Sequence, residues 1–283
     1  MLISAENLSY AYSKGGPFEK LALENININI DKGEFVAVIG HTGSGKSTLI
    51  QHFNGLLKPT SGKITINGLD TIKGNLKDIR KHVGIVFQYP EHQLFEETVH
   101  KDIAFGLQKQ GLSKEEIDKR VVRVSEQVGL TEEILLKSPF ELSGGQKRRV
   151  AIAGVLVMEP QILVLDEPSA GLDPAGRDDI FRLISNLHKN LGITIIFVSH
   201  SMEDVARLAE RVIVLNHGSI EMDGPTPKIF KETERLESIG LSVPQISYLM
   251  KRLKSIIPTL NDEVYTVEAA KNEIMRQLGR SPV

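Results

Sequence analysis

The segment from residue 40 to residue 47 constrains the fold of this chain more than any other feature. It fits the pattern G-x-x-x-x-G-K-[ST], and its residues are Gly40, His41, Thr42, Gly43, Ser44, Gly45, Lys46 and Ser47. An apolar, β-branched run over 35–39 precedes it, and a helix-compatible sequence follows from Thr48. This order predicts a phosphate-binding loop, because glycines let backbone N–H groups converge on phosphate oxygens at a helix N-terminus. The alternative, a glycine-rich turn with a surface lysine, is disfavoured by the flanking strand and helix.

An acidic pair complements this loop. Lys46 can reach the β- and γ-phosphates of a nucleotide, and the Ser47 hydroxyl can ligate Mg²⁺. Asp166 and Glu167 end the buried run 162–165, at the strand edge where ligands bind in open α/β sheets. We expect Asp166 to hold Mg²⁺ through its water shell and Glu167 to orient or deprotonate the attacking water. An acidic pair that merely precedes a turn is the alternative, and the phosphate-binding loop disfavours it.

The composition is that of an ordinary globular protein and excludes several classes. The 283 residues are 41% apolar and 25% charged, which suffices for a core. A net charge of −2 and the lack of tryptophan do not favour nucleic-acid binding. The lack of cysteine excludes disulfides and thiolate catalysis. The N-terminus does not read as a signal peptide, and the apolar run 150–158 is far short of the ~20 residues of a membrane span, so membrane association would require a partner.

Strand-like and helix-like segments alternate along most of the chain, which predicts an α/β protein with a parallel sheet and helices on its faces. Residues 1–30 read as antiparallel strands, since apolar and polar residues alternate over 26–30. Ser113 and Glu116 predict a capping box that opens a helix ending near Gly129.

The chain changes character after the Gly-Pro-Thr-Pro segment at 224–227. Residues 231–283 predict a small helical appendage with helices over 244–254 and 267–278. We expect each helix to have one apolar face. These faces comprise Ile246, Leu249 and Leu253 in the first helix, and Ala270, Ile274 and Leu278 in the second.

A second anion site is predicted at 142–146, Leu-Ser-Gly-Gly-Gln, where a serine and a glycine pair open a helix. A chain needs one such site for each nucleotide. The second site is therefore useful if it serves the γ-phosphate of a nucleotide held by another subunit.

Together these motifs resemble ABC ATPase domains. The phosphate-binding loop is followed by Gln88, 142–146, Asp166-Glu167, 169–173 and His200 in the order and spacing of that family. The resemblance implies a P-loop NTPase with a RecA-like parallel sheet core, an N-terminal antiparallel β subdomain and a helical subdomain. It implies an ATPase domain over 1–230, with the helical signature subdomain at about 89–158. The helical appendage over 231–283 would serve dimerisation.

The resemblance also implies roles for single residues. Tyr12 would stack on adenine, although Tyr10 is close enough to be the alternative. Gln88 would sense the γ-phosphate, and His200 would act as the switch histidine in catalysis beside Glu167. Without the other motifs, Gln88 and His200 would be interpreted as structural. The ATP contacts would be Tyr12, Gly40, His41, Thr42, Gly43, Ser44, Gly45, Lys46, Ser47 and Thr48. The Mg²⁺ ligands would be Ser47, Gln88 and Asp166. The contacts to the opposite subunit's ATP would come from Ser143, Gly144, Gly145, Gln146 and Asp173.

A narrower resemblance is to the ATPases of energy-coupling factor transporters. It lies in 89–99 and 143–154, and the first of these is similar to the second of two paralogous ATPases in such modules. It implies ATP-driven import of vitamins or metal ions at the cytoplasmic face of the membrane. The partners would be a second ATPase, identical or paralogous, an integral-membrane coupling subunit and a substrate-binding membrane subunit, with no nucleic acid.

Other classes fit less well. Another class of ABC transporter stays open as the alternative. A non-transport ABC ATPase of chromosome maintenance would carry a long insertion between Ser47 and Leu142, and a translation-associated one would carry two ATPase halves. A plain P-loop kinase would lack 142–146.

The segment 89–99 is expected to dock on the membrane partner. Leu94 and Phe95 would be apolar anchors, and Glu91, Glu96 and Glu97 would offer charges to basic partner residues. The alternative is a surface loop whose Leu94 and Phe95 pack into the local core.

Overall fold

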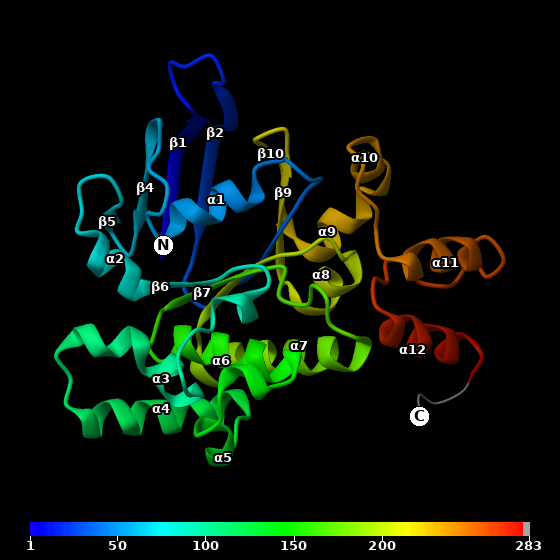
Figure 1. Ribbon diagram of the computed structural model, residues 1–283. Coiled ribbons are helices and arrows are strands. Elements are labelled where there is room, and N and C mark those ends of the chain that lie inside the picture. Colours follow the sequence, from blue (N-terminus) through cyan, green and yellow to red (C-terminus); the bar gives the residue numbers. More distant parts are fainter. Residues whose placement is uncertain (280–283) are drawn as a thin grey trace. The chain divides into compact units, whose positions relative to one another are not determined.

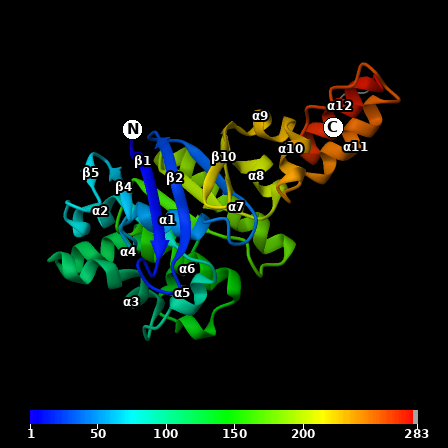
Figure 2. The same ribbon diagram turned by 90° about the horizontal axis from the view of Figure 1, so that it is seen from above.

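The computed structural model describes residues 1–279, which form two compact units. The first unit contains residues 1–34 and 47–198, and the second contains 35–46 and the chain from 199 onward. Figures 1 and 2 label their α-helices and most of their strands. The domain division expected at residue 230 was based on the family resemblance and not on compactness, and it stays a prediction.

The first unit begins with the predicted antiparallel strands. Its four-stranded sheet has the order β2-β1-β4-β5. The strands are β1 (Ile3–Tyr12), β2 (Lys20–Ile30), β4 (Ser61–Ile66) and β5 (Leu69–Asp70). β2 buries Ile26, Ile28 and Ile30 and exposes the residues between them, as the alternation predicts. Asn67 and Gly68 connect β4 to β5 with positive φ angles of 48° and 78°, which a two-residue hairpin turn of this hand requires.

The same unit also contains three parallel strands. They are β6 (Val83–Val86), β7 (Ile162–Asp166) and β8 (Thr194–Val198), with β7 paired to both of the others. β8 is buried along its whole length, and β7 becomes partly exposed only at Asp166. Three helices precede these strands or lie between them along the chain, namely α1 (Lys46–Phe53), α2 (Leu76–His82) and α7 (Pro174–Leu191). This arrangement confirms the predicted α/β class.

A helical region lies between β6 and β7 in the sequence. Its elements are η1 (Pro90–Gln93), α3 (Val99–Ala104), η2 (Phe105–Gln110), α4 (Lys114–Val128), α5 (Glu132–Leu135), η3 (Pro139–Glu141) and α6 (Gly144–Leu156). α6 packs against α3, α4 and η1. The capping box predicted at Ser113 is only half formed. The Ser113 side chain accepts from the N–H of Glu116, but the Glu116 carboxylate accepts from Arg120 Nε at 2.9 Å.

The second unit carries the strand that precedes the phosphate-binding loop. β3 (Phe35–Ile39) pairs parallel with β9 (Arg211–Asn216), and β9 pairs antiparallel with β10 (Ser219–Pro225). The helices α8 (Met202–Leu208), α9 (Thr226–Lys231) and α10 (Thr233–Ser238) belong to the same unit.

The two C-terminal helices lie beside each other, as Figures 1 and 2 show in orange and red. α11 (Gln245–Lys254) and α12 (Val267–Gln277) share a cluster of buried residues. This cluster consists of Met250, Leu260, Val264 and Ala270, with Ile246, Leu253, Ile257 and Ile274 packed against it.

The predicted apolar faces of these helices were wrong at two positions. Leu249 is 47% exposed and Leu278 is 60% exposed. Met250 takes the place expected for Leu249, because the buried face of α11 is centred nearer to residue 250. Leu278 lies just past the last helical residue of α12, so the helical spacing no longer directs it inward.

Candidate functional site

The phosphate-binding loop folds around three glycines with positive φ. The φ angles of Gly40, Gly43 and Gly45 are 154°, 82° and 104°. A side chain at Gly40 would collide with the protein, since its Cβ would lie 2.3 Å from the carbonyl oxygen of Leu215. A Cβ at Gly43 would meet nothing within 4 Å. The loop is therefore closely packed at its start and open at its centre, as a cradle for phosphate requires.

Lys46 lies folded over this loop. Its ammonium donates to the carbonyl oxygens of Gly40 at 2.7 Å and His41 at 3.0 Å, and the residue is 6% exposed. Partial burial, followed by the nearby charge of Lys46, lowers the pKa of His200. The second unit thus brings together the loop lysine and the predicted switch histidine, with the imidazole neutral near pH 7.

The predicted metal ligands Ser47 and Asp166 face each other in the first unit. Ser47 Oγ lies 3.4 Å from Asp166 Oδ2, which is long for a direct hydrogen bond between these groups. Within residues 1–279, no group of three or more histidine or acidic residues is arranged to hold a metal. One hydroxyl and one carboxylate instead suit Mg²⁺, which commonly takes few protein ligands and completes its shell with phosphates and water.

Glu167 occupies a strained turn directly after β7. Its φ is 51°, in the left-handed region, which costs a residue other than glycine about 1–3 kcal/mol. Its N–H donates to the carbonyl oxygen of Val198 at 3.1 Å, and its own carbonyl oxygen accepts from the N–H of Ala170 at 3.0 Å. These two bonds fix the direction in which the side chain leaves the strand end.

The two candidate tyrosines differ in their surroundings. Tyr12 is 40% exposed, and its hydroxyl lies 3.1 Å from Thr48 Oγ1. Tyr10 is half-buried between two rings, because it makes edge-on contacts at 4.9 Å with both Tyr12 and His52. The Tyr12 ring is thus the more accessible of the two, and Tyr10 supports it from behind.

The predicted signature segment opens α6 with a complete capping box. Ser143 Oγ accepts from the N–H of Gln146 at 3.3 Å, and Gln146 Oε1 accepts from the N–H of Ser143 at 3.0 Å. A Cβ on Gly144 or Gly145 would meet nothing within 4 Å. The helix end is therefore rigid and accessible, while the Gln146 amide oxygen is used within the cap.

Asp173 and Gln88 lie at the ends of other elements in the first unit. Asp173 caps α7, with Oδ1 accepting from the N–H of Gly176 at 2.7 Å. Gln88 is exposed in the link between β6 and η1. The next residue, Tyr89, has a φ of 53°, which redirects the chain after Gln88.

The expected docking segment does not present all of its charges. Both carboxylate oxygens of Glu91 accept from Arg148 Nη2, at 3.1 and 3.0 Å, and Arg148 is buried. The expectation that Glu91 offers a charge to a partner was therefore wrong. The importance of Arg148 could not be recognised from the sequence, since the two residues lie 57 positions apart.

Leu94 and Phe95 differ in the same segment. Leu94 is half-buried, whereas Phe95 is 59% exposed and contacts the Phe105 ring edge-on at 4.9 Å.

Among the helices described over residues 1–279, none combines the length and apolarity needed to cross a membrane.

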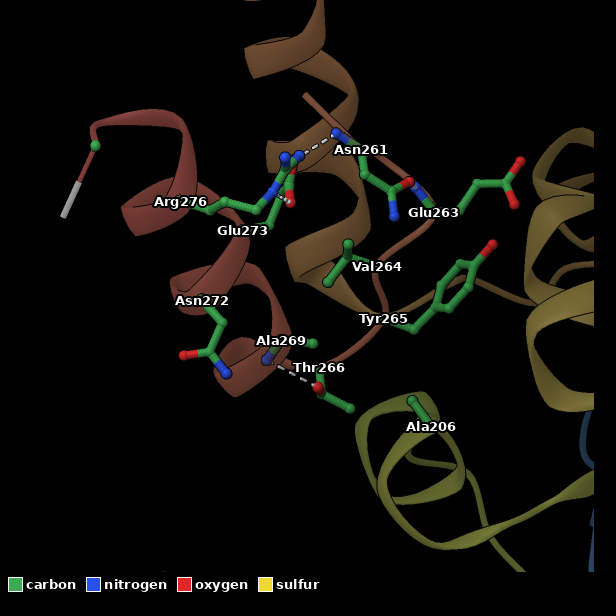
Figure 3. A pocket seen from close by; sticks show the side chains of 11 residues that line it. Ala206, Asn261, Glu263, Val264, Tyr265, Thr266, Ala269, Asn272, Glu273 and Arg276 are labelled. Carbon is green, nitrogen blue, oxygen red and sulfur yellow. Dashed lines mark hydrogen bonds and ion pairs between the residues drawn. The ribbon is translucent and has the colours of Figure 1, made fainter. Parts of the chain in front are cut away.

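A pocket in the second unit is separate from the predicted ATP residues. Its volume is about 920 Å³, and Ala206 and residues of 261–279 line it (Figure 3). Glu273 accepts hydrogen bonds from Arg276, Gln277 and the N–H of Asn261, which lower its pKa to about 2. This carboxylate thus fastens the segment before α12 to the helix.

These features define a nucleotide-binding protein of the P-loop class that carries a second, signature-type helix end. The family model described as ABC transporter matches residues 23–170, and the chain belongs to this family of ATPases, in which ATP hydrolysis is coupled to transport.

Relatives and solved structures agree with this assignment. The chain is 62% identical over 281 residues to the energy-coupling factor transporter ATP-binding protein EcfA2 of Acetivibrio thermocellus, covering 99% of this chain and 100% of the relative. It is 58% identical to EcfA2 of Clostridium perfringens over 97% of this chain and 98% of that protein. The structure of CbiO1 from Clostridium perfringens, part of the ABC transporter complex CbiONQ, is similar with a TM-score of 0.76 and 39% identity over 91% of this chain and 98% of that one. A dimeric ATP-binding cassette, MJ0796, bound to ADP and Pi, is similar with a TM-score of 0.69 and 31% identity over 79% and 98% of the two chains.

Proposed function

We propose that this chain is an ATP-binding subunit of an energy-coupling factor transporter and that its ATP turnover drives uptake of vitamins or metal ions. The observation that carries the proposal is the phosphate-binding loop, in which a buried lysine lies over an open glycine cradle. Identity of 62% to an EcfA2 protein over nearly the whole chain supports the transporter class.

In this proposal the phosphates of the nucleotide bind in the phosphate-binding loop. The N–H groups of 40–48 and the ammonium of Lys46 hold the phosphates, and Tyr12 stacks on the adenine. Mg²⁺, bound by Ser47, by Gln88 and through water by Asp166, would neutralise charge on the phosphates.

Glu167 and His200 would act on the attacking water and the γ-phosphate. The strained turn at Glu167 restrains the backbone that carries this carboxylate, and the lowered pKa leaves His200 neutral, able to donate one hydrogen bond and accept another. Gln88 would report the presence of the γ-phosphate to the segment that follows it.

The second anion site would serve the nucleotide of an opposite subunit. The accessible helix end at Ser143, Gly144 and Gly145, together with Gln146 and Asp173, suits a composite site formed by two ATPases. The second ATPase would be a copy of this chain or a paralogue, and the helices of 231–283 would contribute to the pairing. A membrane-embedded coupling subunit and a substrate-binding membrane subunit would complete the transporter, which would place this chain peripherally at the cytoplasmic face.

Two variants test the chemistry. Glu167→Gln should bind ATP but not hydrolyse it, because an amide cannot accept the proton of the attacking water, and it should trap an ATP-bound dimer. Lys46→Ala should instead weaken ATP binding itself. Near-normal turnover in Glu167→Gln, measured as phosphate release, would remove the base role of Glu167, and unchanged ATP affinity in Lys46→Ala would contradict the binding role of the loop.

A further inference from the structure

Arg148 carries a buried charge and has no role in the reaction proposed above. It lies in α6, two residues after the capping residue Gln146, and is 1% exposed. Arginine is rarely buried to this degree unless its charge and its donors are paired. Its contacts therefore indicate why an arginine occupies this position.

The guanidinium joins α6, the helix in which it lies, to two other segments of the first unit. Nη1 donates to the carbonyl oxygens of Pro168 and Ala170, each at 2.9 Å. Nη2 donates to both carboxylate oxygens of Glu91. The planar fork of arginine makes these bonds together, which the single ammonium of a lysine cannot reproduce.

Each joined segment carries a residue with a proposed role. Glu91 in η1 follows Gln88 by three positions, and Pro168–Ala170 lies between Glu167 and Asp173. Ala170 is bonded on both sides, because its N–H donates to the carbonyl oxygen of Glu167 while its own carbonyl oxygen accepts from Arg148.

A second contact joins two of the same segments. A Cβ built on Gly171 would lie 3.4 Å from Cε1 of Tyr89, so the tyrosine ring lies against the chain just after Ala170. Tyr89 and Glu167 both have positive φ, which persists only where the surroundings hold the backbone. Arg148 can supply that restraint, because it is bonded to the chain close to both residues.

We propose that Arg148 is a positioning residue for ATP hydrolysis. It holds the turn between Glu167 and Asp173, and the segment after Gln88, against the helix that carries the signature. When Gln88 loses its contact with the γ-phosphate, the resulting movement would then be transmitted through the Arg148 side chain. It would reach both the turn after Glu167 and the helix that carries the signature. This role rests on the proposed functions of Gln88, Glu167 and Asp173.

The first test replaces Arg148 by lysine in the full-length chain, assayed at concentrations that give full specific activity. Arg148→Lys should lower kcat by about tenfold or more, because small misplacements of catalytic groups have effects of this size. KM and the Kd for ATP should stay within about twofold of wild type, since the phosphate-binding loop is not touched. Arg149→Lys is the matched control. Arg149 is the next residue of α6, but its Nη1 donates to the carbonyl oxygen of Val128 instead of to Glu91 or the turn at 168–170. Its kcat should stay within about twofold of wild type.

A second test separates positioning from stability. Arg148→Met should lower Tm, because Glu91 keeps a largely buried carboxylate without its cation. Adding Glu91→Met removes both charges, so Tm should recover, while kcat should stay low because Pro168 and Ala170 still lack their donor. A double variant that regains both Tm and turnover, or a normal kcat in Arg148→Lys, would overturn the positioning role. Glu167→Gln run in parallel distinguishes this failure from failure of the proposed function, which would appear as hydrolysis in that variant.

Discussion

Gly40 is the position in the phosphate-binding loop where a side chain should be least tolerated. Its φ of 154° costs a residue other than glycine about 1–3 kcal/mol. An added Cβ would also lie 2.3 Å from the Leu215 carbonyl oxygen and 2.5 Å from Ser44 Oγ, and overpacking of this kind costs a further ~1–3 kcal/mol. We therefore expect Gly40→Ala to lower the free energy of unfolding by about 4 kcal/mol, which lowers Tm by roughly 10 °C in a protein of this size.

Gly43→Ala is the matched control within the same loop. Its φ of 82° is also unfavourable for alanine, but its Cβ would meet nothing within 4 Å. We expect a loss of only about 1–2 kcal/mol in stability. ATP binding should still weaken, because the new methyl group occupies the open side of the cradle. Differential scanning calorimetry gives Tm, and isothermal titration with ATP gives Kd. A Gly40→Ala variant that melts within about 2 °C of wild type would refute the steric reasoning.

Four further predictions concern assembly, metal, pH and coupling. If ATP sites are composite, specific activity should rise with protein concentration or with a partner ATPase, and flat activity across a dilution series of a proven monomer would exclude them. Chelation of Mg²⁺ with EDTA should abolish hydrolysis and leave the folded state, followed by circular dichroism, unchanged. Burial lowers the pKa of His52 from its ordinary 6.5, so its stabilisation is present above that value and is lost as the pH falls through the lower folded value; Tm should fall on acidification below about pH 6.5, and less steeply in His52→Gln. Changing Leu94 and Phe95 to serine, with charge reversal of Glu96 and Glu97, should reduce transport and complex assembly but not ATP binding, and unaltered transport by the stably folded variant would place docking elsewhere.

The features that could be predicted from the sequence are those that a few consecutive residues determine. The Asn67-Gly68 turn adopts the positive φ angles that its residue types favour. The strand and helix around the phosphate-binding loop follow from an apolar run and a helix start on either side of the glycines. Local chemistry also explains the cap at Ser143, since both of its hydrogen bonds are made with Gln146, three residues along the chain.

The features that could not be predicted depend either on competition between two possible partners of one side chain or on contacts between distant segments. Glu116 leaves the expected capping box because Arg120, one turn along the helix, offers a stronger charged partner. Met250 rather than Leu249 is buried, because the position of Leu260 and Val264 decides which side of α11 is covered. Periodicity alone defines a face only to within about one residue on a helix this short.

The docking segment shows how these long-range contacts alter a functional prediction. Its first part is tied inward, since Glu91 is bonded to the buried Arg148. Its second part is turned outward, with Phe95 exposed and the Glu97 carboxylate paired to Lys101 on the surface. The N–H groups of Phe95 and Glu96 both donate to the Asp102 carboxylate, which braces the turn between the two parts.

Because one part contacts the protein interior and the other faces outward, substitutions in the first should affect ATP hydrolysis and substitutions in the second should affect transport. Charge reversal at Glu96 and Glu97 alters a surface that a basic partner would contact, so transport should fall while the ATPase rate of the isolated chain is retained. Glu91→Gln weakens the internal tie to Arg148, so the ATPase rate should fall even when no membrane partner is present. If both changes reduced transport alone, the segment would be a single docking surface, and the inward contact of Glu91 would have no part in hydrolysis.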